Sequence, residues 1–280
     1  GWLEPPEVPG VDYVFWDAGE PLPPEQDLAR VTVFVPPYMD PHPEMLEQLP
    51  ALREVQALMA GVDGIVSAVP EGVELRRAAG LHDTSTAELA VGLMIAQLRG
   101  IDDAARAMIT GTWDHRRRPA LADRTVGIVG WGGVGQAVGA RLAGFEVQVV
   151  PISRSGSDGA RPVTELDALL PELDVVVLCT PLDESTRHLL DARRLALLPD
   201  GALVVNVGRG ALVDTSALIE ELRSGRLRAA LDVTDPEPLP PGHALWHCPN
   251  LLITPHVGGD SEAFVPRARR LIADRITRLG

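Results

Sequence analysis

Three side chains that suit carbonyl chemistry each follow an apolar segment that predicts a strand. They are Arg209, Glu237 and His256. An arginine can hold a carboxylate through two parallel hydrogen bonds, and a histidine exchanges protons near neutral pH. A glutamate beside the imidazole would hold it and favour its charged form. If the three side chains converge beside a nicotinamide, they suit the reduction of a carbonyl group on a small acid.

A glycine-rich turn between an apolar strand and a helix predicts a dinucleotide-binding site. It matches the pattern G-x-G-x-x-G and reads Gly130-Trp131-Gly132-Gly133-Val134-Gly135. The glycines allow a tight turn, close approach of the backbone to a pyrophosphate, and close packing of helix on strand. The pattern alone is common, but here Thr125–Val129 precedes it, and Gln136–Leu142 and Val147–Val150 follow. This order is that of a complete strand-helix-strand unit.

The end of the second strand of this unit bears on the choice of cofactor. Proteins that bind NAD usually carry an acid there, about 20 residues past the glycines, for the ribose 2′-hydroxyl. This chain has Ser153, Arg154 and Ser155 instead. The missing acid removes repulsion toward a 2′-phosphate, and the three side chains supply hydrogen-bond donors. We therefore predict that NADPH is preferred over NADH. The alternative is that Arg154 points to solvent and the two cofactors are used equally.

Strands and helices alternate from residue 125 to 256, which predicts a parallel sheet with helices on both faces. The expected strands are Val126–Val129, Val147–Val150, Val175–Cys179, Leu203–Val207, Ala229–Leu231 and Leu251–Ile253. We expect an α/β fold in which residues 84–258 form a doubly wound Rossmann cofactor domain. The carboxyl ends of such strands line the ligand crevice, so Arg209, Glu237 and His256 should meet there.

The remaining segments predict a smaller domain made from residues 1–83 and 259–280. Its expected elements are strands at Val11–Trp16, Val31–Val35 and Val55–Leu58, a short helix near Pro43–Leu49, and a final helix over Ser261–Leu279. A long helix from Thr84 to about Ile109 should begin the larger domain. Because the chain opens at Gly1 without Met, we expect a further N-terminal segment to precede it.

The composition excludes several classes of function. The net charge is −14, and no apolar run approaches the length of a membrane span, so we expect no nucleic acid or membrane partner. The chain contains no lysine, which excludes Schiff-base chemistry and a lysine base. Cys179 and Cys248 are too few for a disulfide framework and indicate the reducing cytoplasm.

These motifs together resemble the D-isomer-specific 2-hydroxyacid dehydrogenases, and among them most closely the glyoxylate/hydroxypyruvate reductases. The matching segments run in family order from about residue 55 to 260. They are Ala60–Asp63, Ser85–Glu88, the glycine turn, Thr180–Leu182 with Thr186, Asn206–Gly210, Asp232–Pro238 and Pro249–His256. The resemblance implies that the smaller domain is a flavodoxin-like substrate domain and that the protein forms a homodimer through the cofactor domain, with the helix after Thr84 as a candidate interface.

The resemblance also implies a role for each matching position. Arg209 would bind the carboxylate and carbonyl of a small 2-oxo acid, His256 would exchange the proton, and Glu237 would raise the pKa of His256. Ala60 and Gly61 would close over the substrate carboxylate. The remaining positions would contact the cofactor: Gly133 and Val134 at the pyrophosphate, Thr180 and Pro181 on the adenosine side, Asp232 at the carboxamide, and Thr186, Val207, Gly208 and Gly258 elsewhere along it.

Several alternatives stay open. Asp232 could instead cap a turn, and Tyr38 could enter the substrate crevice or only pack. The spacing of His243, His247 and Cys248 could hold zinc, although their Pro/Gly-flanked loop argues against a metal. The substrate could be 3-phosphoglycerate or a bulkier 2-oxo acid. The same fold also serves as a nucleotide-sensing corepressor, which would keep Arg209, Glu237 and His256.

Overall fold

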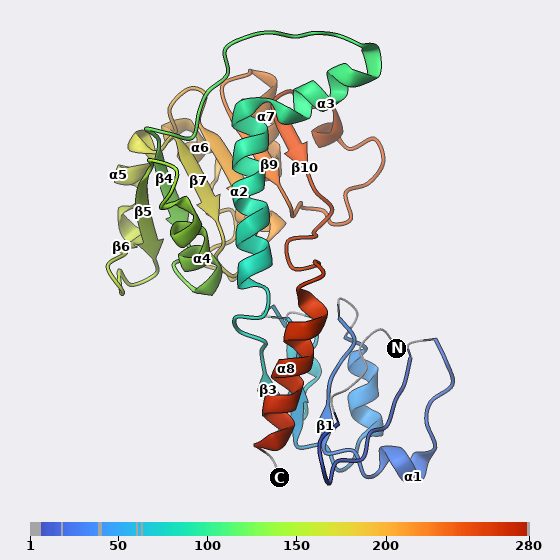
Figure 1. Cartoon of the computed structure of the whole chain (residues 1–280). Coiled ribbons are helices and arrows are strands. Elements are labelled where there is room, and N and C mark those ends of the chain that lie inside the picture. The colour runs from blue at the N-terminus through green and yellow to red at the C-terminus, as the bar shows by residue number, and fades with distance from the viewer. Residues whose placement is uncertain (1–6, 18, 39–40, 60, 63, 279–280) are drawn as a thin grey trace. The chain divides into compact units, whose positions relative to one another are not determined.

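The computed structural model describes residues 7–17, 19–38, 41–59, 61–62 and 64–278. The chain divides into two compact units, each with its own parallel sheet (Figure 1). The smaller unit contains residues 1–82 and 261–280, and the larger contains residues 83–260. The domain limits expected from the sequence lie within two residues of this division.

The larger unit is built on a parallel sheet with the strand order of a dinucleotide-binding fold. In the described part of the chain it has seven strands, in the order β10-β9-β8-β7-β4-β5-β6. Their bounds are β4 Thr125–Val129, β5 Gln148–Ser153, β6 Arg161–Pro162, β7 Val175–Leu178, β8 Leu203–Asn206, β9 Arg228–Leu231 and β10 Leu251–Ile253. The direction of strand addition reverses between β4 and β7. At such a switch point a crevice opens outside the carboxyl ends of the strands.

Helices cover both faces of this sheet, and the central strands β4, β7 and β8 are accordingly mostly apolar and buried. On one face Val175 and Val177 pack with α2 (Asp83–Arg99) and α4 (Gly133–Leu142). On the other face Val176 and Leu178 pack with a second set of helical segments. These are η3 Val163–Glu165, α5 Leu166–Leu169, η4 Leu170–Glu172, α6 Ala192–Leu197, η5 Gly210–Leu212, α7 Thr215–Arg223 and η6 Ala244–His247. The doubly wound fold predicted from the sequence is confirmed.

The helix expected from Thr84 to about Ile109 is two helices, so that prediction is wrong. α2 ends at Arg99, and α3 begins at Ile101 and ends at Thr110. Between them Gly100 has a φ of +63°, a conformation that breaks a helix and that glycine adopts at little cost. A Cβ there would also lie 2.6 Å from the guanidinium carbon of Arg118.

The smaller unit contains a parallel sheet of three strands among its described residues, in the order β1-β2-β3. Its elements are α1 Glu25–Leu28, β1 Val33–Phe34, η1 Pro43–Gln48, β2 Glu54–Gln56, η2 Val66–Ala68, β3 Glu74–Arg76 and α8 Phe264–Thr277. The C-terminal helix α8 packs through Phe264 and Ile272 against a cluster that includes Leu58. Buried Glu54 accepts hydrogen bonds from Arg275 of α8 and from Arg76, and those bonds, from Arg275 first, hold its pKa below its ordinary value.

Three expectations for this unit need correction, and one strand was not anticipated. Residues 11–16 form no strand, and the short helix near Pro43 is a 3₁₀ helix. The strand expected at Val31–Val35 is only two residues long, and β3 was not anticipated. The Pro-rich turns that flank these segments remove backbone donors and limit the length of paired strand. None of the described helices is both long and apolar enough to cross a membrane.

Candidate active site

The glycine turn connects the end of β4 to the first turn of α4. Gly130 has a φ of +108°, and a Cβ there would lie 2.7 Å from the backbone of Cys179 and Thr180. A Cβ on Gly135 would lie 2.0 Å from the carbonyl oxygen of Gly130. Both positions therefore require glycine: a side chain at 130 would meet the backbone after β7, and one at 135 would force α4 away from the turn.

The N-terminus of α4 is open where a dinucleotide would need it to be. Gly132 is the N-cap residue, and a Cβ on it would meet no atom within 4 Å. A Cβ on Gly133, in contrast, would lie 1.8 Å from the Asp83 carboxylate, which leaves this position without room for a side chain. The first N–H groups of a helix have no intrahelical partner and carry a partial positive charge. Open space in front of such groups fits a pyrophosphate.

The end of β5 carries the three residues expected at the ribose. Ser153 accepts a hydrogen bond at its Oγ from the backbone N–H of Gly156 at 3.0 Å, which shapes the turn. Ser155 contacts Ser157 through its hydroxyl. The Arg154 side chain is 74% exposed, and its Nη2 lies 2.5 Å from Oδ2 of Asp183. Arg154 thus pairs with a neighbouring acid while most of its side chain stays exposed to solvent.

The segment after β7 forms a tight turn organised by two side chains. Asp183 accepts hydrogen bonds at Oδ1 from the backbone N–H groups of Ser185 and Thr186, at 2.8 and 3.1 Å. The buried hydroxyl of Thr186 donates to the carbonyl oxygen of Pro181 at 2.9 Å and accepts from the Asp183 N–H at 2.7 Å. Thr186 therefore sets the path of the turn that carries Thr180 and Pro181.

The turn after β8 presents Arg209. Asn206 is 1% exposed and ties the turn together: its Nδ2 donates to the carbonyl oxygen of Arg209 at 2.9 Å, and its Oδ1 accepts from the Gly208 N–H at 3.1 Å. Buried Val207 continues the pairing of β8 with Leu178. The guanidinium of Arg209 donates to the carbonyl oxygen of Gly208 at 2.8 Å and interacts electrostatically with the His256 and Glu237 side chains.

Asp232 organises the segment that carries the histidine. Its buried carboxylate accepts three hydrogen bonds, from the Thr254 hydroxyl at 2.6 Å and from the N–H groups of Val257 and Gly258 at 3.0 and 2.8 Å. A Cβ on Gly258 would lie 2.9 Å from this carboxylate. These bonds match the alternative in which Asp232 caps a turn. Its predicted contact with a carboxamide stays a prediction.

Glu237 and His256 form a contact pair on the segments after β9 and β10. The imidazole Nδ1 of His256 hydrogen-bonds Oε1 of Glu237, while Oε2 of Glu237 accepts from the Thr234 N–H at 3.3 Å. The backbone of His256 has a φ of +53° and is held by a hydrogen bond from its N–H to the carbonyl oxygen of Asp232. Both side chains keep about a third of their surface exposed, so the free edge of the imidazole, Nε2, can reach a ligand.

The two side chains of this pair shift one another's pKa in opposite directions. The hydrogen bond to Glu237 raises the pKa of His256, against the opposing effects of burial and of the Arg209 charge. Burial on its own would raise the pKa of Glu237, but the hydrogen bond from His256 and its charge outweigh burial and lower it. The arrangement stabilises an imidazolium beside a carboxylate, and an imidazolium can donate a proton to a carbonyl oxygen.

The remaining candidate residues make other contacts or belong to segments whose predicted role stays a prediction. Ala60 lies outside the described residues, and Gly61 belongs to the smaller unit, so their contact with a substrate carboxylate stays a prediction. Tyr38 packs against the rings of His82 and Phe264. His243 accepts a hydrogen bond from the Leu245 N–H and so caps a 3₁₀ helix. In the described ranges, no three His, Cys, Asp or Glu side chains are grouped as metal ligands would be.

The sequence reasoning gave no role to Asp183 or Asn206, although both shape the site. The signal for Asp183 was available, because an Asp followed by Ser185 and Thr186 is typical of a side-chain-capped turn. The signal for Asn206 was weaker. A buried asparagine at the end of an apolar strand must satisfy its amide, and here the following turn does so.

Comparison with known proteins gives one family. Residues 91–258 match the model of the D-isomer specific 2-hydroxyacid dehydrogenase NAD binding domain. A glyoxylate reductase from Thermofilum pendens is 33% identical over 229 residues, which cover 76% of this chain and 68% of that protein. A hydroxypyruvate reductase from Thermotoga maritima is 33% identical over 227 residues, 78% of this chain and 74% of the relative.

A solved structure extends the similarity to nearly the whole chain. It is a D-isomer specific 2-hydroxyacid dehydrogenase from Xanthobacter autotrophicus Py2, in complex with NADPH and MES. The two structures align with a TM-score of 0.79 and 31% identity, over 97% of this chain and 88% of the other. The similarity includes both the larger and the smaller unit.

Proposed function

The chain belongs to the D-isomer specific 2-hydroxyacid dehydrogenase family, and we propose that it reduces glyoxylate or hydroxypyruvate to the D-2-hydroxy acid with NADPH. It is an NAD(P)-dependent oxidoreductase of 2-hydroxy acids by membership of that family. The observation that carries the finer proposal is the Glu237–His256 pair with Arg209 beside it, at the carboxyl ends of three adjacent strands.

Proton transfer in this proposal is the task of His256. Its Nδ1 is engaged by Glu237, so Nε2 carries the proton that a carbonyl oxygen receives. Because the pKa of His256 is raised, more of the imidazole is protonated at a given pH than in an unperturbed histidine. The bound nicotinamide supplies the hydride to the carbonyl carbon. In the reverse reaction, neutral His256 takes the hydroxyl proton, and Glu237 stabilises the resulting charge.

Substrate binding in this proposal depends on Arg209. Its planar guanidinium can hold a carboxylate through two hydrogen bonds, and its charge polarises the adjacent carbonyl group. Asn206 fixes the backbone of the turn from both sides, so the arginine leaves the sheet in a defined direction. A 2-oxo acid carries its carboxylate next to its carbonyl, which matches an arginine and an imidazolium that interact with each other.

The proposed preference for NADPH depends on Arg154 and the serines beside it. No acid stands at residues 153–155, and Arg154 offers a guanidinium at the end of β5. The similar structure from Xanthobacter autotrophicus contains NADPH, which supports the proposal by likeness. The glycine turn and the N-terminus of α4 would hold the pyrophosphate whichever cofactor binds.

Initial rates of NADPH and NADH oxidation with glyoxylate, hydroxypyruvate, pyruvate, phenylpyruvate and 3-phosphohydroxypyruvate test this function. We expect the first two substrates to be fastest, with NADPH the better donor. Arg154→Asp should reverse the cofactor preference, because it restores the acid that suits a 2′-hydroxyl. Faster turnover of a larger or phosphorylated acid would contradict the proposed substrate class. Unchanged NADPH affinity in Arg154→Asp would contradict the proposed cofactor preference.

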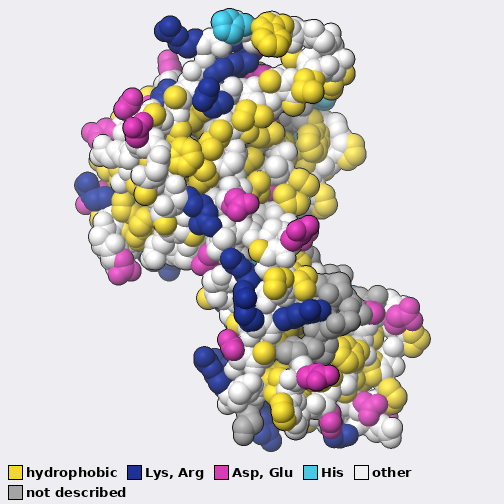
Figure 2. Space-filling model, in the orientation of Figure 1, with side chains coloured by type: hydrophobic (Ala, Val, Ile, Leu, Met, Phe, Trp, Pro, Cys, Tyr) yellow, Lys and Arg dark blue, Asp and Glu magenta, His cyan; other side chains and the backbone are white. Residues whose placement is uncertain are grey.

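A second copy of the chain is the partner we propose for α3 and the segment after it. Four large apolar side chains in this region are more than half exposed: Ile101, Met108, Ile109 and Trp113, the last at 93%. Figure 2 shows hydrophobic side chains gathered on the face of the larger unit that carries α2 and α3. Such patches on a soluble protein mark interaction sites.

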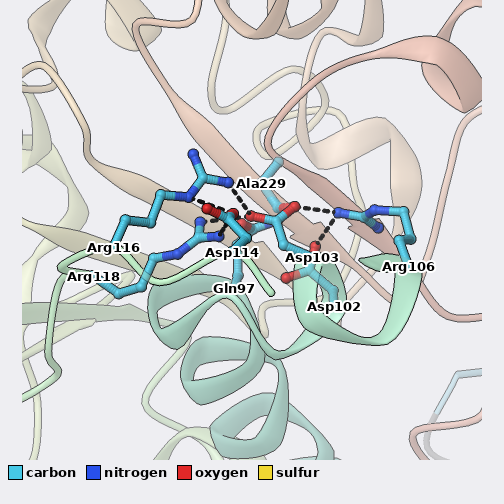
Figure 3. Close-up of polar contacts among 8 residues, drawn as sticks. All are labelled: Gln97, Asp102, Asp103, Arg106, Asp114, Arg116, Arg118 and Ala229. Carbon is cyan, nitrogen blue, oxygen red and sulfur yellow. Dashed lines mark hydrogen bonds and ion pairs between the residues drawn. The ribbon is translucent and has the colours of Figure 1, made fainter. Parts of the chain in front are cut away.

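Ion pairs fix the conformation of α3 and of the segment after it before a partner subunit binds. Asp103 of α3 pairs with Arg106 at 2.7 Å and with Arg118 of the following segment at 2.5 Å (Figure 3). Arg116 and Arg118 both pair with Asp114 as well. A preformed surface loses less conformational entropy on association, which favours a stable homodimer.

A further inference from the structure

We propose that Asp183 is a specificity-determining residue at the cofactor ribose: its carboxylate competes with a 2′-phosphate for Arg154 and takes the 2′-hydroxyl of NADH. The loop after β7 would thus supply the acid that the end of β5 lacks. This proposal rests on the proposed function in one respect, that Arg154 faces the ribose 2′-position.

The topology brings the two residues together at the glycine turn. In the sheet β5 and β7 are the two neighbours of β4, so the segments that leave their carboxyl ends flank the turn that follows β4. Arg154 comes directly after β5, and Asp183 comes five residues after the end of β7. Their side chains meet with Nη2 of Arg154 at 2.5 Å from Oδ2 of Asp183. The ion pair therefore lies at the crevice where the adenosine half of a dinucleotide binds in this fold.

The acid of this pair is the fixed partner. Its Oδ1 accepts hydrogen bonds from the Ser185 N–H at 2.8 Å, from the Ser185 hydroxyl at 2.5 Å and from the Thr186 N–H at 3.1 Å. The hydrogen bond from Ser185 above all holds the pKa of Asp183 below its ordinary value. Arg154, in contrast, is on a long and largely exposed side chain. The carboxylate stays in place and ionised, while the guanidinium can change partner.

NADH and NADPH interact differently with the Arg154–Asp183 ion pair. The hydroxyl of an NADH ribose can donate to Oδ2 of Asp183 without disturbing Arg154. A 2′-phosphate must draw the guanidinium away from Asp183 and then lie close to a carboxylate of like charge. Arg154 favours NADPH, and Asp183 opposes that preference. The measured preference should therefore reflect the difference between two opposing effects.

Asp183→Asn tests this without removing the turn. Asparagine is as good as aspartate at capping, so the bonds to Ser185 and Thr186 can remain. Asp191→Asn is the matched control, because Asp191 caps α6 by accepting from the Arg194 N–H at 2.8 Å and loses the same charge. Binding of 2′,5′-ADP and of 5′-ADP, measured by calorimetry, reports on the 2′-position independently of turnover. The NADPH to NADH ratio of kcat/KM is measured alongside.

We expect Asp183→Asn to bind 2′,5′-ADP about two- to fivefold more tightly, the size typical of an exposed charge pair, with no gain for 5′-ADP. The NADPH to NADH ratio of kcat/KM should rise by a similar factor, and Asp191→Asn should match the wild type. A change below about twofold in both measurements overturns the proposal. If Asp183→Asn does not fold, Asp183→Ser keeps the cap and removes the charge.

Arg154→Gln separates this proposal from the preference for NADPH itself. If Arg154→Gln weakens 2′,5′-ADP binding while Asp183→Asn has no effect, the role of Asp183 fails and the NADPH proposal stands. If the wild type prefers NADH but Asp183→Asn shifts it toward NADPH, the role of Asp183 stands and the NADPH preference fails.

Discussion

His256 and Glu237 lie 19 residues apart in sequence, and the imidazole Nδ1 of the first contacts the carboxylate of the second. The two residues follow neighbouring strands, β9 and β10, so the parallel sheet itself brings them together. The contact raises the pKa of His256 and directs its other nitrogen away from Glu237. Acid–base behaviour in the proposed reaction is therefore a property of the pair.

Glu237→Gln should move the pH profile of reduction toward lower pH. The substitution removes the charge that stabilises the imidazolium, so the pKa of His256 falls and less of it is protonated at neutral pH. We expect the alkaline limb of kcat/KM for 2-oxo acid reduction to shift down by about one pH unit. Glu44→Gln is the control, because Glu44 forms the same kind of contact with His42, at 2.7 Å, in the smaller unit. A profile that does not move in Glu237→Gln would contradict the coupling.

Asp232→Asn should destabilise the segment that carries His256. Thr254 and Val257 can still donate to the remaining oxygen, but an amide nitrogen placed toward the Gly258 N–H would set two donors against each other. The free energy of unfolding should fall by about 1–3 kcal/mol, the cost of an unsatisfied buried group. Urea denaturation measures it. Asp214→Asn, which alters the N-terminal cap of α7, should lose less than half as much; an equal loss in both would count against this role for Asp232.

Two glycines of the turn after β4 should respond to alanine in different ways. A methyl group on Gly135 would overlap the Gly130 carbonyl oxygen, so Gly135→Ala should lower the melting temperature by several degrees, equivalent to about 1–3 kcal/mol. A methyl group on Gly132 meets nothing in the protein. Gly132→Ala should therefore melt like the wild type and yet bind NADPH at least about tenfold more weakly, because the methyl takes the space of the pyrophosphate. Unimpaired cofactor binding in Gly132→Ala would show that the pyrophosphate lies elsewhere.

Charged substitutions on α3 should dissociate the proposed dimer. Ile109→Glu and Trp113→Glu place a carboxylate where a partner subunit would bury an apolar side chain, and each should weaken self-association at least about tenfold. Sedimentation velocity over a range of concentrations measures the effect. Phe15→Glu, at an exposed apolar position of the smaller unit, is the control and should leave the assembly unchanged. A wild-type chain that sediments as a monomer at micromolar concentration would refute the interface.

The larger unit was the part most open to prediction from sequence. Its central strands are buried on both faces and contain apolar runs, and the glycine turn follows the first of them. Arg209, Glu237 and His256 could be placed together because each follows such a strand. The break at Gly100 was not predicted, since an apolar period continues across it and only the backbone conformation reveals it. The pairing of Arg154 with Asp183 was not predicted either, because it depends on the order of strands rather than on any local pattern.

Proton transfer by His256 is the central claim, and its most direct test is the rate of NADPH oxidation with glyoxylate by the wild type and by His256→Asn. Asparagine is the appropriate replacement, because position 256 has a φ of +53° and asparagine tolerates that conformation better than alanine. The account predicts that kcat falls by about 10² to 10⁴, while the melting temperature and the affinity for 2′,5′-ADP stay at wild-type values. A variant that folds, binds nucleotide and reduces glyoxylate at close to the wild-type rate would contradict it.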